Sequence, residues 1–566
     1  MTFAPQKDEA SGTINSLISR SIVQRVYNDG DNTYLTIRQE ARNSLPLVST
    51  SSTLIVPLTN PNVDFVQFDK SFIRLHATIT LNLSGYEKAT TEDDTEAITN
   101  GIMLFVGLKN SSDFIQEYAV YHKGKQIAGT LQSNATVESF LYHASRSATD
   151  TMNRLGIHSV AEKVAESDDS SVCGDYLNLS TLQAAMDEEN GGTRTIEMDL
   201  GINIPFNDIL IFQQFQTYPA ALFGDLEIRF KVNPNALVCL PCNPLASLRQ
   251  LNIAKGIHSP IQKLINQYEV EATPCTREYT QLGDEFIAIR HAKLSESDDG
   301  EFLNGYQLVS LPCAAVSLSF NSITIDECYS TILGYRAKPE SLEKMRQKFE
   351  KYPWVKFSQN VNYLQFSSKP TTNMSMTQQV YLNNTTDMIL LFPTTSHEAG
   401  NTVYKNPMLQ NLSLIAMNRK YPETGFDTTS DQFLQLQLNS IHGTPQQEVV
   451  SSLTDLRWDT EEAMCADFDR TSFFAAFKVE RPSAMGLICD GLDSKGYQVP
   501  IRLMAQPKYA TPNDQYCYYS ENTAPLPPPI LITVNDSYFI FNSKDGGQCI
   551  YSNREFNDTV ATFMRQ

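Results

Sequence analysis

The residues of this sequence whose types and spacing could support chemistry begin with a pair of cysteines. Cys239 and Cys242 form a CxxC pair, a spacing at which two thiolates can bind zinc or exchange a disulfide. A structural zinc site needs a second pair, and Cys173 and Cys275 each stand alone at unsuitable spacing. We therefore expect no metal site, and we interpret Cys239 and Cys242 as two small residues at the end of a strand.

Two histidines and two carboxylates are the other candidates for acid–base chemistry. His122 and His143 have no carboxylate or cysteine partner at an informative spacing, so we expect ordinary surface or packing residues. Asp225 and Glu227 alternate with apolar residues in the segment 225–232, the pattern of a strand whose polar face meets water or a partner. The sequence therefore predicts no catalytic residue and no cofactor, and we expect that the protein is not an enzyme.

The stretch 203–242 must position several of these residues. Its first part is an amphipathic run that ends at Tyr218 and Pro219, and its later part, LEIRFKV, alternates apolar and charged residues. This alternation predicts a strand with one buried face, and the charged face must meet water or a polar neighbour because charges are not buried unpaired. The stretch is therefore expected to close one sheet of a sandwich, with one half of the chain before it and a second half after it.

Length and charge limit the possible classes of protein. With 566 residues the chain exceeds what one hydrophobic core usually serves, which favours two large β domains. The 64 acidic residues outnumber the 44 basic ones and no basic run is present, so we expect no direct nucleic-acid partner. Ten sparse cysteines indicate reduced thiols and synthesis in the cytosol. We also expect no secretory signal and no membrane-spanning segment.

Period-two alternation recurs along most of the chain and predicts an all-β protein. Clear examples are residues 73–83, 316–320, 473–479 and 499–503, whereas 338–355 is the best isolated helix, with Pro339 near its start. Many short strands with few helices appear twice over. The economical architecture is two tandem antiparallel β-sandwiches with a few short helices in loops.

The expected domain organisation follows from these segments. It consists of an N-terminal arm (1–50), a first sandwich (51–245), a connection (246–285), a second sandwich (286–545) and a C-terminal tail (546–566). The arm is polar, and its one apolar stripe consists of Ile18, Ile22, Val23 and Val26, which are spaced for one face of a short helix. We expect this stripe to mediate contacts between subunits, because the arm has little else to order it.

Several blocks of sequence, taken in order, carry a resemblance to a known family. They are IMLFVGLKNSSDFIQEYAVYHKGKQI, NATVESFLYHA, IPFNDILIFQQFQTYPAALFGDLEIRFKVNPNA, YRAKPESLEKMRQKF, DMILLFPTTSHEAGNTVYKNPMLQNLSLIAMNRKYPE, GLICDGLDSKGYQVPIRLMAQP and PPPILITVNDSYFIF. Over roughly residues 55–545 the chain resembles the double jelly-roll major capsid proteins of Polinton/Maverick elements, adintoviruses and virophages, in the adenovirus hexon lineage. The order and spacing of the blocks together make this match specific.

The resemblance implies a fold and a function. It implies two jelly rolls side by side, with three copies forming a pseudo-hexagonal capsomer and capsomers tiling an icosahedral shell. The protein would then be a structural component of the virion, synthesised in the host cytoplasm. Its implied partners are itself as a homotrimer, neighbouring capsomers, and penton and minor capsid proteins, and contact with an inner membrane stays open.

Two other functions also stay open on the sequence alone. One is a transient double jelly-roll scaffold that shapes a membrane during assembly, as the poxvirus scaffold does. The other is an enzyme or carbohydrate-binding protein built on β-sandwiches, for which Asp225 and Glu227 would be the nominated carboxylates. A structural shell protein accounts best for the arm, the two sandwiches and the missing active site.

Overall fold

The structure is a computed structural model. It describes residues 33–48, 52–84, 103–130, 174–178, 194–209, 211–212, 217–241, 273–275, 280–281, 285–291, 306–312, 317–366, 374–393, 402–404, 406–407, 409–428, 473–479, 491–507, 527–542 and 548–552. Ile18, Ile22, Val23 and Val26 of the expected arm lie outside these ranges, as do His143, Cys173 and Cys242.

The first sandwich has an outer sheet, here named sheet I. Its four main strands lie side by side in the order β1 (Thr33–Glu40), β17 (Ser317–Arg336), β4 (Phe72–Ser84) and β9 (Arg194–Pro205). Short strands β3 (Phe65–Gln67), β10 (Thr217–Tyr218) and β14 (Thr280–Gln281) extend it. Every second residue of β4 from Ile73 to Leu83 is buried, as its alternating sequence predicts.

Sheet II is the second sheet of this sandwich and is built in two parts. One part has the order β2 (Leu54–Pro57), β11 (Leu226–Val232), β6 (Ile115–His122) and β7 (Lys125–Thr130). The other has the order β13 (Thr273–Pro274), β12 (Leu237–Pro241), β5 (Met103–Leu108) and β8 (Gly174–Asn178). The 3-10 turns η2 (Ser111–Phe114) and η4 (Pro234–Ala236) join β5 to β6 and β11 to β12, so the two parts continue one another.

The second sandwich comprises sheets III and IV. Sheet III has the order β18 (Trp354–Gln365), β25 (Ile530–Asn542), β20 (Thr385–Leu391) and β23 (Ala475–Lys478), and β26 (Gln548–Ser552) adds to β25. Sheet IV has the order β19 (Met374–Tyr381), β24 (Gln498–Pro507), β21 (Leu409–Ala416) and β22 (Arg419–Phe426). The expected strands at 473–479 and 499–503 therefore fall in opposite sheets of one sandwich.

The strand order makes each sandwich a jelly roll. If the strands of the second sandwich are numbered one to eight along the chain, sheet III reads 1-8-3-6 and sheet IV reads 2-7-4-5. The first sandwich gives the same two orders when β5–β6, β7–β8 and β11–β12 each count as one strand. Eight antiparallel strands in this double Greek-key order define a jelly roll, so the expected all-β fold with two tandem jelly rolls is confirmed.

Three strands lie in different parts of the fold from those expected. The expected organisation assigns β1 to the N-terminal arm (1–50), β17 to the second sandwich (286–545) and β26 to the C-terminal tail (546–566). In the structure β1 and β17 pair within sheet I, and β26 pairs with β25. The physical reason is that alternation identifies a strand and its buried face without identifying its neighbour in the sheet. The chain therefore passes from the first sandwich to the second after β17, at helix α12.

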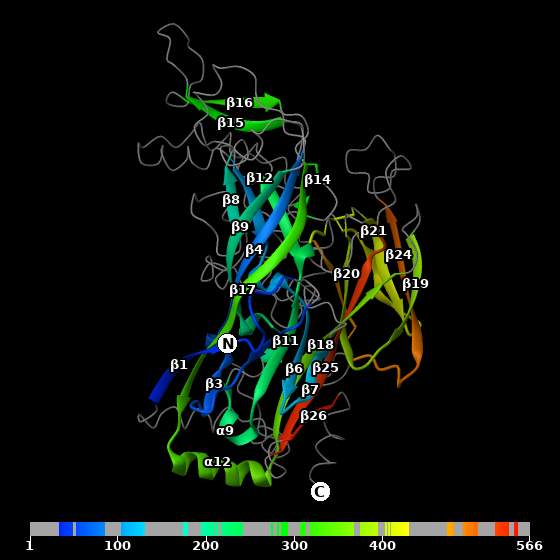
Figure 1. Cartoon of the computed structure of the whole chain (residues 1–566). Helices are drawn as coiled ribbons and strands as arrows, with labels where there is room; N and C mark the ends of the chain where they lie inside the picture. Colours follow the sequence, from blue (N-terminus) through cyan, green and yellow to red (C-terminus); the bar gives the residue numbers. More distant parts are fainter. Residues whose placement is uncertain are drawn as a thin grey trace, which may run out of the picture.

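Helix α12 (Pro339–Lys351) confirms the helix expected at 338–355. Pro339 occupies the first turn, where its missing N–H costs nothing, and Met345 and Phe349 are buried on one face. The shorter helix α9 (Ala220–Phe223) lies beside it, as Figure 1 shows at the foot of the first sandwich. The remaining elements are the 3-10 turns η1 (Phe68–Lys70) and η3 (Phe206–Asp208) and the hairpin of β15 (Glu285–His291) and β16 (Tyr306–Pro312).

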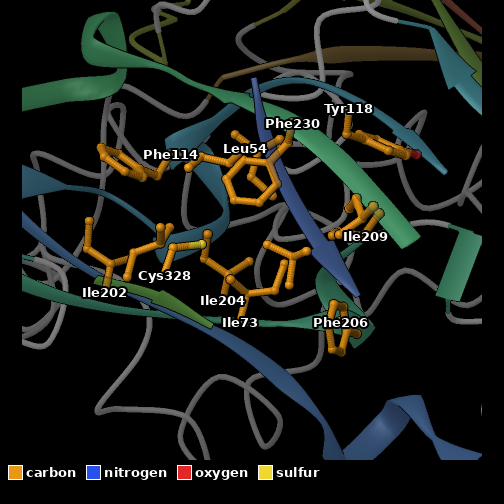
Figure 2. Packing of buried hydrophobic residues seen from close by; sticks show 14 of the residues in the cluster. Leu54, Ile73, Phe114, Tyr118, Ile202, Ile204, Phe206, Ile209, Phe230 and Cys328 are labelled. Carbon is orange, nitrogen blue, oxygen red and sulfur yellow. The ribbon is translucent and has the colours of Figure 1, made fainter. Parts of the chain in front are cut away.

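Separate hydrophobic cores fill the two sandwiches. In the first, Leu54 and Phe230 of sheet II pack with Ile73 and Ile204 of sheet I (Figure 2). The second core gathers residues of sheets III and IV. Sheets II and III face one another between the two cores, since His122 of β6 contacts Phe541 of β25 and β26 lies against β7. Sheets I and IV are therefore the sheets of each sandwich that lie away from this contact, and Figure 1 shows the strands of sheet IV at the right of the molecule.

Candidate functional site

His122 lies in a packed position where it cannot act as a catalytic base. Its imidazole is almost fully buried, and Nε2 donates a hydrogen bond to the Phe223 carbonyl oxygen at 2.7 Å. The ring also meets Phe541 edge to face, with centroids 5.5 Å apart. Burial lowers the pKa of His122, and the carbonyl partner opposes this only in part. The sequence-based interpretation of His122 as a packing residue is therefore confirmed.

The two nominated carboxylates make structural contacts. The Asp225 carboxylate accepts a hydrogen bond from the Thr59 hydroxyl at 3.3 Å. Glu227 is almost buried between two guanidinium groups, with Arg42 at 2.8 Å and Arg229 at 2.6 Å. Because both Glu227 oxygens are held by cations, the carboxylate is well placed to tie β11 to the segment that follows β1.

The thiol of Cys239 has a partner that the sequence analysis did not assign. Strand β13 pairs with β12 and brings Cys275 beside it, and the two buried thiols form a hydrogen bond. That hydrogen bond, together with burial, raises the pKa of Cys239 well above its ordinary value. A thiol held protonated in this way is a poor nucleophile and a poor metal ligand.

The described residues offer no alternative reactive centre. Among them, no three His, Cys, Asp or Glu side chains are grouped so that they could hold a metal ion. Within the same ranges, no helix has the length and apolar character needed to cross a bilayer.

An aromatic cluster joins the two sandwiches near α9 and α12. Trp354 of β18 and Phe541 of β25, both from sheet III, lie with ring centroids 5.2 Å apart. Tyr218 and Phe223 of the first sandwich pack on this pair, with centroid distances between 5.2 and 6.1 Å. Phe349 of α12 adds an edge contact to Phe223 at 5.4 Å. This aromatic junction buries its rings completely or nearly so.

Local backbone geometry sets up the junction. Helix α9 ends at Gly224, whose φ of 95° is readily adopted only by glycine, and the chain there turns into β11. The Tyr218 hydroxyl donates a hydrogen bond to the Gly224 carbonyl at 2.9 Å. Burial raises the pKa of Tyr218 well above its ordinary value, so this donor proton stays in place. The turn thus holds Tyr218 and Phe223 against sheet III.

A second contact between the sandwiches lies away from the aromatic junction. Lys109, which follows β5, donates a hydrogen bond from its buried Nζ to the Thr402 carbonyl at 3.0 Å. Tyr404, two residues further on, covers Ile389 and Ile532 on the face of sheet III that turns away from the second core. Two separate contacts of this kind fix the sandwiches to one another more firmly than one would.

Sequence reasoning missed the aromatic junction, although one signal pointed to it. Trp354 is one of only two tryptophans in the chain and follows Pro353 directly after the best predicted helix. A tryptophan at a strand start is a typical anchor, because it buries a large apolar area. Its partners come from residues more than a hundred positions away in either direction, which no local pattern reveals.

Comparison with known proteins gives structural likeness without sequence similarity. No family model matches the chain, and a sequence comparison with characterised proteins finds no match. The fold is similar to the mavirus major capsid protein (10% identity, 99% of this chain and 94% of that chain, TM-score 0.41). It is also similar to the Faustovirus major capsid protein (9% identity, 94% and 98%, TM-score 0.43) and to a chain of the Sputnik virophage (11% identity, 92% and 88%, TM-score 0.42).

Proposed function

We propose that this chain is a structural major capsid protein without enzymatic activity. Three copies would form a pseudo-hexagonal capsomer, and capsomers would tile an icosahedral viral shell. The observation that carries the proposal is the pair of jelly rolls of identical strand order, locked together by the aromatic junction and the Lys109 contact. Two such units in one chain allow three chains to supply six similar blocks around a threefold axis.

The chemistry of the described residues agrees with a structural role. The candidates for catalysis are used internally: His122 donates to a carbonyl, Glu227 holds two arginines, and Cys239 is a protonated thiol. The resemblance of the sequence blocks to double jelly-roll capsid proteins points in the same direction. We infer that the protein resides in the virion after synthesis in the host cytoplasm.

The finer partners belong to the same proposal. Neighbouring capsomers, penton proteins and minor capsid proteins would contact the trimer, and its base could approach an inner membrane. Residues 1–32, with the apolar stripe Ile18, Ile22, Val23 and Val26, would act as an arm between subunits. Direct contact with nucleic acid is not expected, because acidic residues outnumber basic ones by 64 to 44.

Negative-stain electron microscopy and mass photometry of the full-length protein test this proposal. We expect homotrimers in dilute solution, and shells or hexagonal arrays at higher concentration. Arrays that form only on added lipid vesicles would indicate a membrane-shaping scaffold instead. Dispersed monomers that bind an immobilised glycan panel would contradict a capsid role and favour a carbohydrate-binding protein.

A further inference from the structure

The outer face of sheet IV differs from the rest of this acidic chain. Strands β19, β24 and β21 contain one charged residue, Arg502. Strand β22 adds Arg419, Lys420 and Glu423, so the sheet as a whole carries three basic side chains and one acidic side chain. Within the described residues, none of the three cations forms an ion pair, and the Arg502 guanidinium donates only to the Ser375 hydroxyl at 2.9 Å.

Exposed apolar groups gather at one end of this face. Tyr381 ends β19, Tyr497 precedes β24, and Met417 follows β21 at the turn to β22. The register of β19 and β21 on β24 places the three at the same end of the sheet. They are 57%, 76% and 43% exposed, which is unusual for side chains of this size. A surface depleted of charge, with exposed tyrosine and methionine, has the composition of a protein interface.

The outer face of sheet I, on the other side of the molecule, carries a group of carboxylates. Its strands contain five acidic residues and four basic ones, Arg38, Arg74, Arg194 and Arg336. Glu197 and Asp199 of β9 and Asp326 and Glu327 of β17 are all exposed there, on either side of β4. Arg38 approaches Glu327 at 3.7 Å. In the part of the chain that the structure describes, Glu197, Asp199 and Asp326 form no ion pair.

One hydroxyl group lies between two of these carboxylates. The Oγ1 atom of Thr78 is 2.9 Å from an Asp199 oxygen and 2.8 Å from an Asp326 oxygen. A hydroxyl carries a single proton, so it can donate to only one of the two carboxylates at a time. Two carboxylates held this close on an exposed surface repel one another unless a cation approaches both. An arginine side chain from outside the molecule meets that requirement, because its planar fork can bind two carboxylate oxygens.

We propose that the outer face of sheet IV in one copy docks on the outer face of sheet I in the next copy. Arg502 and Lys420 of one copy would meet Asp199 and Asp326 of its neighbour. Because the two faces differ and lie on opposite sides of the molecule, the contact is heterologous and repeats head to tail until a ring closes. The inference rests on the proposed capsomer and assigns the surfaces that build it.

The opposite charges on the two outer faces favour a second copy of this chain as the binding partner. Two chains of net charge −20 repel one another over most of their surfaces. The strands of sheet IV contain three basic residues and one acidic residue, and three of its four strands carry at most one charge each. This face can therefore approach an acidic copy without that repulsion. Complementary charge also fixes the register of the two faces and excludes the reversed arrangement, in which like faces meet.

A charge-swap experiment on the full-length protein tests the docking surface. One variant combines Lys420→Glu with Arg502→Glu, and a second combines Asp199→Lys with Asp326→Lys. We expect each variant to need at least about tenfold more protein to form the trimer, as measured by mass photometry. A third variant that carries all four substitutions restores the attraction with reversed sign, and we expect it to form trimers again at the concentration of the unmodified protein.

Matched controls use charges on helix α12, which lies on neither face. Glu343→Lys with Glu350→Lys and Arg346→Glu with Lys351→Glu make the same changes in net charge at exposed positions. These controls should leave the trimer unchanged, and circular dichroism should show that every variant is folded. Unchanged trimers in both two-site variants, or failure of the four-site variant to recover, would overturn the assigned surfaces while leaving the capsid proposal in place. An unmodified protein that stays monomeric would overturn the capsid proposal itself.

Discussion

Phe223 and Trp354 stack face to face, with ring centroids 5.2 Å apart and ring planes 9° apart. Phe223 ends helix α9 in the first sandwich, whereas Trp354 begins β18 in the second. The stack is therefore a direct link between two jelly rolls. The two rings belong to the same buried cluster as residues of the first core, so the stack both stabilises that core and fixes the position of the second sandwich against the first.

Replacement of Trp354 by alanine should weaken both sandwiches. Removal of a buried tryptophan costs about 3–5 kcal/mol, because the ring's contacts are lost and a cavity remains. Denaturant unfolding followed by fluorescence and circular dichroism should show this loss of free energy of unfolding. Glu350→Ala on α12 is the control, since that side chain is exposed and lies on neither docking face, and it should change stability by less than about 0.5 kcal/mol. Equal effects from the two substitutions would contradict the role of the aromatic junction.

His122 should make stability depend on pH. Burial lowers its pKa in the folded state, so the unfolded chain takes up the proton first as the pH falls. The contribution is present above the ordinary histidine pKa of about 6.5 and is lost progressively as the pH falls below it. We expect the unmodified protein to lose on the order of 1 kcal/mol more than His122→Gln between about pH 7.5 and about pH 5.5.

Thermal or denaturant unfolding at each pH measures this difference. The glutamine variant is a suitable comparison because its amide can still donate to the Phe223 carbonyl but does not titrate. Parallel pH profiles for the two proteins would exclude His122 as the titrating group.

Two N-terminal deletions should behave differently. Removal of residues 2–32 leaves β1 intact and should not change the melting temperature. Removal of residues 2–48 also deletes β1, which pairs with β17 along its whole length, and takes Leu35 and Ile37 from the first core. Loss of these partly buried side chains and their neighbours should lower the free energy of unfolding by on the order of 4 kcal/mol.

Differential scanning fluorimetry of both truncated proteins provides the measurement, and mass photometry reports whether trimers persist. The arm expected from sequence reached residue 50 and so included β1. Equal melting temperatures for the two deletions would mean that β1 adds nothing to the first sandwich.

The buried cysteines should resist alkylation. Burial raises the pKa of Cys328 to about 12, with the nearby Glu40 as a smaller cause. The pKa of Cys239 is raised by its hydrogen bond with Cys275 and by burial, and the pKa of Cys549 is raised by burial. Because the thiolate is the reactive form, iodoacetamide at about pH 8 should label Cys328 more than about a hundredfold more slowly than a free thiol. Peptide mass spectrometry gives the rate, and labelling in urea should proceed normally. Rapid labelling of the folded protein would show that the first core opens.

Individual strands were predictable from sequence, whereas their neighbours were not. The alternation of β4 and β11 and the apolar stripe of α12 fix their buried faces, since these patterns follow from backbone geometry. The pairing of β1 with β17 joins residues about three hundred positions apart, and period two is the same whichever neighbour a strand takes. For this reason β1 resembled a polar arm and β17 resembled part of the second sandwich.

The candidate functional features were less predictable still. His122 was expected to be an ordinary surface or packing residue, because no partner stood at an informative spacing, and it is a packing residue. Glu227 was expected on a solvated or interface face, whereas it is almost buried between two arginines. The aromatic junction and the Thr78 site depend on side chains that meet only after three or more distant segments have folded. Such meetings are set by topology, which composition and periodicity do not specify.

The position of Phe539, Phe541 and Cys549 in the first hydrophobic core has a consequence for biosynthesis. A ribosome makes the chain from its N-terminus, and these three residues lie near the end of its 566 positions. The core of the nascent first jelly roll therefore stays incomplete until the whole second jelly roll has been translated. The apolar residues that these three side chains cover must be protected from non-specific association during that time. A premature stop codon that removes only the final strands would consequently damage the half of the protein that was synthesised first.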